Sequence, residues 1–249
     1  MLLVLLLIIF LKQTDKKKKY YLEEISKEPL GANQRLREKK TKTRRNKIDY
    51  LVKVAIFASI ASLLYTVPFL QFKLPFFPQF LEFQFSNLPG ILAGFVLGPV
   101  GGSLVIIIKT IVKLPMSGTM CVGEAADLII GVSTVVVSSI IYNKKRDIKG
   151  GIIALSVGAI VWVFASVFAN WAVLIRWYAH LFGGMETIIN MCKPVVPFIN
   201  KENFMLVYLT VCCLPFNLLL SLITIVVTFF TYKHVSRIFQ KDFFKKWKY

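Results

Sequence analysis

The stretch Gly150–Tyr178 reads GGIIALSVGAIVWVFASVFANWAVLIRWY and contains a single charged residue, Arg176. A helix needs about 20 apolar residues to cross roughly 30 Å of hydrocarbon. This stretch is longer than that, so it predicts a membrane-spanning helix. The whole chain agrees with that reading, because it is 56% hydrophobic and has a mean hydropathy of +0.64.

Further apolar blocks lie on both sides of this stretch, separated by short polar or proline-containing joints. They cover residues 48–69, 88–97, 103–114, 122–142 and 204–232. Together the blocks predict an all-α integral membrane bundle of about six transmembrane helices. The chain then divides into a basic N-terminal extension (1–47), disordered or lying on the membrane surface, a six-helix membrane domain (48–240) and a basic tail (241–249).

The positive charge is concentrated at the ends of the apolar blocks. The net charge is +18, and of the 31 Lys and Arg, 14 lie in 12–47, four in 144–149 and six from 233 onward. Basic residues beside apolar spans are typical of cytoplasmic segments, whereas this placement does not favour nucleic-acid binding. Six crossings then place both termini in the cytoplasm of a multi-pass plasma membrane protein.

The candidate ionisable residues inside the predicted spans are Lys109, Glu124, Asp127 and Arg176. Charged groups in lipid are costly and usually face a cavity or a partner. Glu124 and Asp127 are three residues apart and share one face of their helix. Either these residues contact a substrate, or Lys109 pairs with one carboxylate and holds helices together. Arg176 lies near a helix end, where its long side chain is expected to reach the membrane surface.

Two amides, Asn170 and Asn217, lie deep in the last two apolar blocks. A carboxamide both donates and accepts hydrogen bonds, so it suits a heterocycle with alternating donors and acceptors. The simpler reading is a hydrogen bond between helices. The residues themselves leave both readings open.

Small residues line one side of the first predicted span. Ala55 and Ser59, and likewise Ala58 and Ser62, are spaced four apart. Such pairs let a second helix approach closely, within the same chain or from a separate subunit.

Motifs for catalysis are missing from the sequence. It contains no HExxH, GxSxG or Walker A pattern, and its four cysteines lack metal-ligand spacing. Glu124 and Asp127 alone are too few ligands for a metal site. We therefore expect no enzymatic activity, no ATPase, no metal and no cofactor in this chain, and any energy for transport must come from elsewhere.

An ordered set of segments resembles the riboflavin-binding S component of energy-coupling factor transporters. The segments are Leu81–Pro89, Gly94–Pro99, Lys109, Ser117–Asp127, Phe168–Trp171 and Pro215–Asn217. The resemblance implies a substrate-binding six-helix domain that captures riboflavin from outside and delivers it inward. It also implies three partner chains, a transmembrane coupling subunit and two ATPase subunits.

The resemblance assigns roles to particular residues. Asn170 and Asn217 match family positions that hydrogen-bond the flavin, and the small-residue side of the first span matches the docking surface for the coupling subunit. Three positions depart from the family pattern: Leu220 replaces a lysine, Asp127 an asparagine, and Thr110 an asparagine after Lys109. The alternatives are an S component for another vitamin, such as folate, thiamine or a related heterocycle, and a membrane protein without a ligand.

Overall fold

The computed structural model describes the backbone of residues 32–243 and side chains from 41 to 232. Residues 51–240 form one compact unit. The predicted states of residues 1–31 and 244–249 lie outside the described residues. The boundaries of the extension, membrane domain and tail stay predictions.

The first helix that the structure describes is longer than the sequence suggested. Helix α2 runs without a break over Ala32–Thr66. Residues 32–47 are therefore helical. The reason is local, because the segment is rich in Lys and Arg, which favour helix, and contains neither Gly nor Pro. Whether the extension is otherwise disordered or lies on the membrane surface stays a prediction. Pro68 follows the end of the helix.

In the part of the chain that the structure describes, five helical segments are long and apolar enough to cross a membrane: Thr41–Thr66, Pro99–Met116, Val122–Lys144, Ile148–Leu181 and Phe204–Tyr232. The second comprises α4 (Pro99–Lys113) and the 3-10 turn η2 (Leu114–Met116), and the third is α5 (Val122–Lys144). The fourth joins α6 (Ile148–Ala169), η3 (Asn170–Leu174) and α7 (Ile175–Leu181). The fifth joins α9 (Phe204–Val207), η4 (Tyr208–Cys213) and α10 (Leu214–Phe243). The predicted helical membrane bundle is confirmed.

The remaining predicted span is a short, buried helix. Helix α3 (Leu88–Leu97) has 10 residues, of which all but Leu88 are buried. Its length of about 15 Å is half of the hydrocarbon layer. The chain before it forms η1 (Pro68–Leu70) and a two-stranded antiparallel hairpin of β1 (Phe72–Lys73) and β2 (Glu82–Phe83). Helix α3 alone is therefore too short to span the hydrocarbon layer.

Glycines allow α3, α4 and α5 to pack closely. A Cβ on Gly102 would lie 2.5 Å from Val135 Cγ1, 2.8 Å from the Gly90 carbonyl oxygen and 2.8 Å from Gly94 Cα. Gly98 joins α3 to α4 with a φ of +87°, which glycine adopts without strain. These contacts fix the side of the bundle that carries Lys109 and Asp127.

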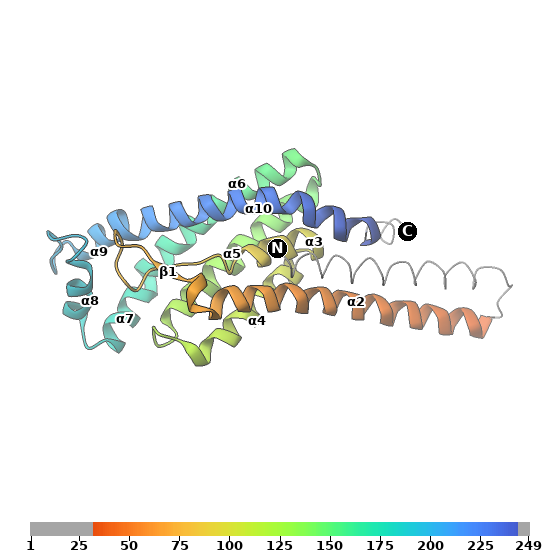
Figure 1. Ribbon diagram of the computed structural model, residues 1–249, viewed down its shortest axis with the longest axis horizontal. Helices are drawn as coiled ribbons and strands as arrows, with labels where there is room; N and C mark the ends of the chain where they lie inside the picture. The colour runs from red at the N-terminus through yellow and green to blue at the C-terminus, as the bar shows by residue number, and fades with distance from the viewer. Residues whose placement is uncertain (1–31, 244–249) are drawn as a thin grey trace. The chain divides into compact units, whose positions relative to one another are not determined.

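The hairpin segment and the last helices meet at one end of the bundle. Figure 1 shows residues 68–87 running out towards α9 and back to α3, with α8 (Met185–Cys192) beside α7 at that same end. Helix α8 contributes Ile188, Ile189 and Cys192 to a buried apolar cluster shared with η4. By the charge-based topology, this is the outer end of the protein.

Candidate substrate site

Asn170 and Asn217 lie on one seam between α6–η3 and η4–α10. They are 7% and 6% exposed, so neither side chain points to lipid. Tyr208 Oη donates to Asn170 Oδ1 at 3.1 Å, and Trp162 Nε1 donates to Asn217 Oδ1 at 3.2 Å. The interhelical hydrogen bonds expected of such amides are therefore present.

The two asparagines are connected through a short ladder of hydrogen bonds. Asn170 Nδ2 donates to the Ser166 carbonyl at 2.8 Å, and Cys213 Sγ lies 3.9 Å from that same oxygen as a donor. Asn217 Nδ2 donates to the Cys213 carbonyl at 2.9 Å. The seam thus brings both predicted binding amides into one continuous polar line between two helices.

Each carboxamide keeps capacity for a further partner. An amide has two N–H donors and an oxygen with two lone pairs. Asn170 uses one donor on Ser166 and one lone pair on Tyr208. Asn217 makes the matching pair of bonds, with one further weak contact to Cys213 Sγ at 3.7 Å. The seam can therefore still offer both donors and acceptors to a bound molecule.

A π-helix occurs in each of the two spans at this level. η3 begins at Asn170, and η4 covers Tyr208–Cys213, just before Asn217. A π-helical turn holds an extra residue and is found frequently at functional sites. Here the two turns orient the side chains of the seam.

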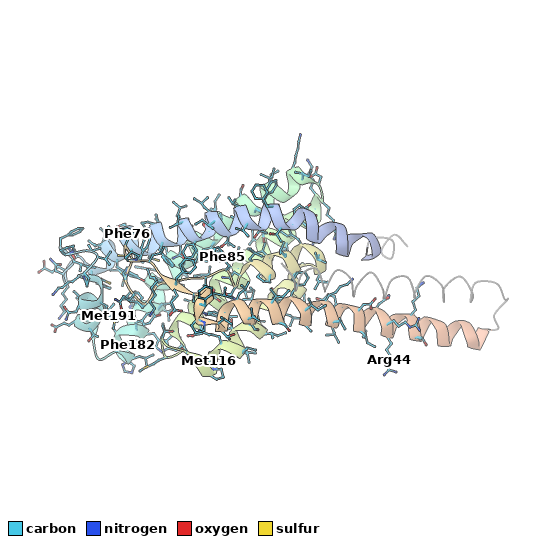
Figure 2. All side chains as sticks on the ribbon, in the orientation of Figure 1. Arg44, Phe76, Phe85, Met116, Phe182 and Met191 are labelled. Carbon is cyan, nitrogen blue, oxygen red and sulfur yellow. The ribbon has the colours of Figure 1, made fainter. Side chains whose placement is uncertain are left out.

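Aromatic side chains of the hairpin segment cover this region. Phe77 and Phe83 pack on Phe216, next to Asn217, with ring centroids 5.2 and 6.4 Å away. Phe80 lies 5.9 Å from the ring of Tyr208, which bonds Asn170. In Figure 2, Phe76, Phe182 and Met191 lie at the same end, from the hairpin segment, the end of α7 and α8. Flat apolar surfaces and spare amide groups therefore occur together.

Lys109 and Asp127 form a buried ion pair, which confirms the pairing interpretation. Lys109 Nζ lies 2.6 Å from Asp127 Oδ2, and the Lys109 side chain is fully buried. Nζ also donates to Ser86 Oγ at 2.5 Å and to Asn87 Oδ1 at 2.8 Å, and it lies 4.6 Å from the Tyr65 ring centroid. Asn87 Nδ2 completes the network on Asp127 Oδ1 at 2.8 Å. The network joins α2, α4 and α5 to the residues just before α3.

Glu124 stands apart from that ion pair. Its Oε2 accepts hydrogen bonds from Ser117 Oγ at 2.8 Å and Thr119 Oγ1 at 3.0 Å, and the residue is 3% exposed. The turn before α5 that supplies these hydroxyls has positive φ at Met120 and Cys121. Glu124 therefore organises an outer turn, and Lys109, Glu124, Asp127 and the two amides do not form a single cluster of direct contacts.

The small-residue side of α2 is divided by the fold. Ala55 and Ser59 are exposed, Ser62 is half-buried, and Ala58 is buried inside this chain. Ser59 Oγ donates to the Ala55 carbonyl at 2.8 Å, so the hydroxyl donor of Ser59 is satisfied within its own helix. Ala55 and Ser59 are thus the pair that another subunit can reach.

Several residues of the site were not predicted from the sequence. Ser86 and Asn87 precede α3. Serine and asparagine before an apolar run are typical of the start of a helix, so their sequence context indicates a cap and not a site residue. Tyr208 and Trp162 sit in apolar blocks with no pattern to distinguish them from lipid-facing aromatics. Among the side chains of residues 41–232, no group of three His, Cys, Asp or Glu residues is arranged to hold a metal ion.

Comparison with known proteins identifies the family. The sequence model described as "ECF transporter, substrate-specific component" matches residues 49–232. The chain is 26% identical over 191 residues to riboflavin transporter RibU of Staphylococcus aureus (strain TCH60), covering 77% of this chain and 92% of the relative. It is 27% identical over 140 residues to riboflavin transporter FmnP of Bacillus subtilis (strain 168), covering 54% and 72%.

A solved structure supports the same conclusion. The S component reported under "Structure and mechanism of the S component of a bacterial ECF transporter" matches with a TM-score of 0.58 at 26% identity, covering 77% of this chain and 97% of that chain. The protein is thus a multi-pass plasma membrane subunit that binds a substrate, is not an enzyme and associates with a transmembrane coupling subunit and ATPases. The chain belongs to the family of substrate-specific (S) components of energy-coupling factor transporters.

Proposed function

We propose that this S component captures riboflavin at the outer side of the membrane and delivers it inward with a coupling subunit and two ATPase subunits. The observation that carries the proposal is the polar seam of Asn170 and Asn217, with unused donors and acceptors beside the aromatic rings of the hairpin segment. A flavin ring is flat and alternates donors and acceptors along one edge. The names of the two similar transporters support the same vitamin.

The direct test is ligand identity. We expect the purified chain to carry or bind a flavin, visible as absorption in the blue. Titration with riboflavin up to micromolar concentration measures the affinity. A chain that shows no binding over that range would remove riboflavin from the proposal.

Variants at the seam test the location of the site. Asn170→Ala or Asn217→Ala should weaken riboflavin binding by about 1–3 kcal/mol each, because a polar edge of the ligand loses its partner. Asn190→Ala, at an exposed position of α8, is the matched control and should bind normally. Unfolding temperatures of all three variants separate lost binding from lost folding. Unchanged affinity in both seam variants would contradict the location.

A second candidate is another flat vitamin. It is favoured by Leu220, which is 5% exposed on α10, one turn after Asn217, and offers no charge or hydrogen bond there. Lys109 is engaged with Asp127. A thermal-shift panel of riboflavin, folate and thiamine distinguishes the two candidates, because only the bound vitamin stabilises the native state.

A further inference from the structure

A group of basic residues lies in α2 just before the apolar part of its span. The basic cluster consists of Lys42, Arg44, Arg45 and Lys47, and all four side chains are exposed. The family model begins at residue 49, so the cluster lies outside the segment that matches the family. Vitamin capture therefore gives no reason for four neighbouring cations at this position.

Within the described part of the chain, no acidic side chain pairs with the basic cluster. Across residues 41–232, no carboxylate oxygen lies within 4 Å of any of its four charged groups. The basic segment 144–149 differs, because Lys145 Nζ lies 3.8 Å from Asp147 Oδ2 and Arg146 donates to Asn143 Oδ1 at 2.8 Å. Like charges on neighbouring turns of a helix destabilise it, so an anionic partner would relieve the repulsion within the cluster.

The position of the cluster along α2 corresponds to the lipid headgroups. The apolar side chains of Ile48, Leu51 and Val52 follow it directly and are 50%, 60% and 50% exposed, and Tyr50 lies among them, as is typical of the membrane–water interface. At 1.5 Å per residue, the cluster extends from about 4.5 to about 12 Å from Tyr50 along the helix axis. The headgroup layer is about 5–8 Å thick, and long basic side chains bridge several further ångströms. The four charges can therefore reach lipid phosphates.

Two of the basic residues continue a stripe of exposed apolar residues on α2. Arg44 is four residues before Ile48 and seven before Leu51, and Arg45 is three before Ile48 and seven before Val52. Residues at these spacings lie on one side of a helix. Exposed apolar side chains in a span face lipid, and Figure 2 shows Arg44 projecting from α2. Arg44 and Arg45 therefore extend the side of the helix that contacts lipid.

The four cations are also distributed around the helix, which bears on the kind of partner. At about 100° per residue, Arg44, Arg45 and Lys47 lie roughly 200°, 300° and 140° from Lys42 around the axis. A folded protein or a nucleic-acid strand contacts a helix from one side, and only part of this ring of charges would reach it. Lipid headgroups lie on several sides of a span at once. The distribution therefore favours the membrane surface over a macromolecule.

We infer that the basic cluster binds anionic phospholipids of the cytoplasmic leaflet. Its ammonium and guanidinium groups donate charge-assisted hydrogen bonds to phosphate oxygens of the headgroups. A basic segment beside a span is attracted to the negative surface of that leaflet by about fivefold in affinity for each cation. The inference goes beyond vitamin capture and is independent of which vitamin the chain binds.

The test measures the lipid preference of the full chain. The delipidated protein in a neutral detergent is titrated with phosphatidylglycerol and with phosphatidylcholine of the same acyl chains, and native mass spectrometry counts the bound lipids. We expect wild type to prefer phosphatidylglycerol by about tenfold or more, and added salt to weaken the preference. The neutralised variant, which should lose the preference, combines Lys42→Gln, Arg44→Gln, Arg45→Gln and Lys47→Gln. The matched control, which should keep it, removes four cations elsewhere by Lys144→Gln, Lys145→Gln, Arg146→Gln and Lys149→Gln.

Further variants separate lost binding from lost folding. Arg44→Gln alone should lower the preference about two- to fivefold, and Arg44→Lys should keep most of it, because the charge remains. A wild-type chain that binds both lipids equally overturns the inference, as does a preference that the neutralised variant retains or that the control loses to the same extent. A single-stranded oligonucleotide tests the other class of polyanion. If the neutralised variant loses oligonucleotide binding but keeps the lipid preference, the cluster binds nucleic acid and the inference is overturned.

Discussion

At the scale of single residues, the Lys109–Asp127 pair stabilises the fold. Removing only one of the two partners is costly, because the other charge then stays buried without a counter-ion. Asp127→Ala leaves the fully buried ammonium of Lys109 with only Ser86, Asn87 and the Tyr65 ring. We expect a loss of about 3–5 kcal/mol in the free energy of unfolding. Denaturation in mixed micelles, followed by circular dichroism, measures the loss.

The control for this prediction is the exposed pair Lys73–Glu82, 3.9 Å apart with side chains 55% and 33% exposed. Glu82→Ala should change stability by less than about 1 kcal/mol, because water screens the pair. Replacing both buried partners, Lys109→Met with Asp127→Leu, should recover much of the loss. An Asp127→Ala variant as stable as wild type would refute a structural role for the pair.

The cysteines offer a second prediction at this scale. Burial raises the pKa of the Cys192 thiol to about 12, and Cys212 nearby adds to the shift. The reactive thiolate of Cys192 is therefore scarce at neutral pH and still scarce near pH 9. We expect N-ethylmaleimide to label half-buried Cys121 first and Cys192 only after unfolding, as read by mass spectrometry of peptides. Equal labelling rates in the native protein would show that α8 does not stay docked.

At the scale of elements, glycine determines how closely α3 and α4 approach. Gly102→Ala would place a methyl group 2.8 Å from backbone atoms of α3 and 2.5 Å from Val135. Because backbone cannot yield as a side-chain tip can, the helices must separate, at a cost of about 1–3 kcal/mol. Gly118→Ala is the matched control, since nothing lies within 4 Å of its added Cβ. The unfolding temperatures of the two variants check the difference, and equal values would contradict the close packing.

The sequence predicted most elements because apolar length is a strong signal for a span. It could not predict that the segment before α3 folds into the protein. The prolines and charges of Gln71–Asn87 are typical of an exposed loop, and they conceal Phe83, Ser86 and Asn87, which are buried by contacts with residues far along the chain. It could not predict the π-helices either, because their apolar composition matches an ordinary α-helix.

Part of the candidate site could be predicted from the sequence, namely its polar residues, but not the partners of these residues. Ionisable and amide residues stand out in apolar blocks, so Lys109, Asp127, Asn170 and Asn217 could be identified directly. Their partners could not, since pairing across helices depends on the bundle.

At the scale of the whole molecule, the exposed part of the small-residue side of α2 is where we expect the coupling subunit to dock. Ser59→Trp should block assembly with the coupling and ATPase subunits by preventing close helix approach. Vitamin binding by the isolated chain should persist, because Ser59 is exposed and its hydroxyl bonds the Ala55 carbonyl within its own helix. Co-purification of the transporter subunits measures assembly.

The control places the same bulk elsewhere on the lipid-facing surface. Ile160 on α6 is 68% exposed, so Ile160→Trp should leave assembly intact. Normal co-purification of the Ser59→Trp variant would exclude this part of α2 as the docking surface.

The two π-helical turns alter the rotational phase of the spans that contain them. One additional residue in a turn rotates every later side chain by about 100° around the axis, relative to its position in an uninterrupted α-helix. A helical wheel that assumes 100° per residue throughout Ile148–Leu181 will therefore predict the membrane-facing residues correctly either before or after η3, but not in both parts. Tryptophan scanning of this span should show two stripes of tolerated positions whose periodicity breaks at Asn170–Leu174.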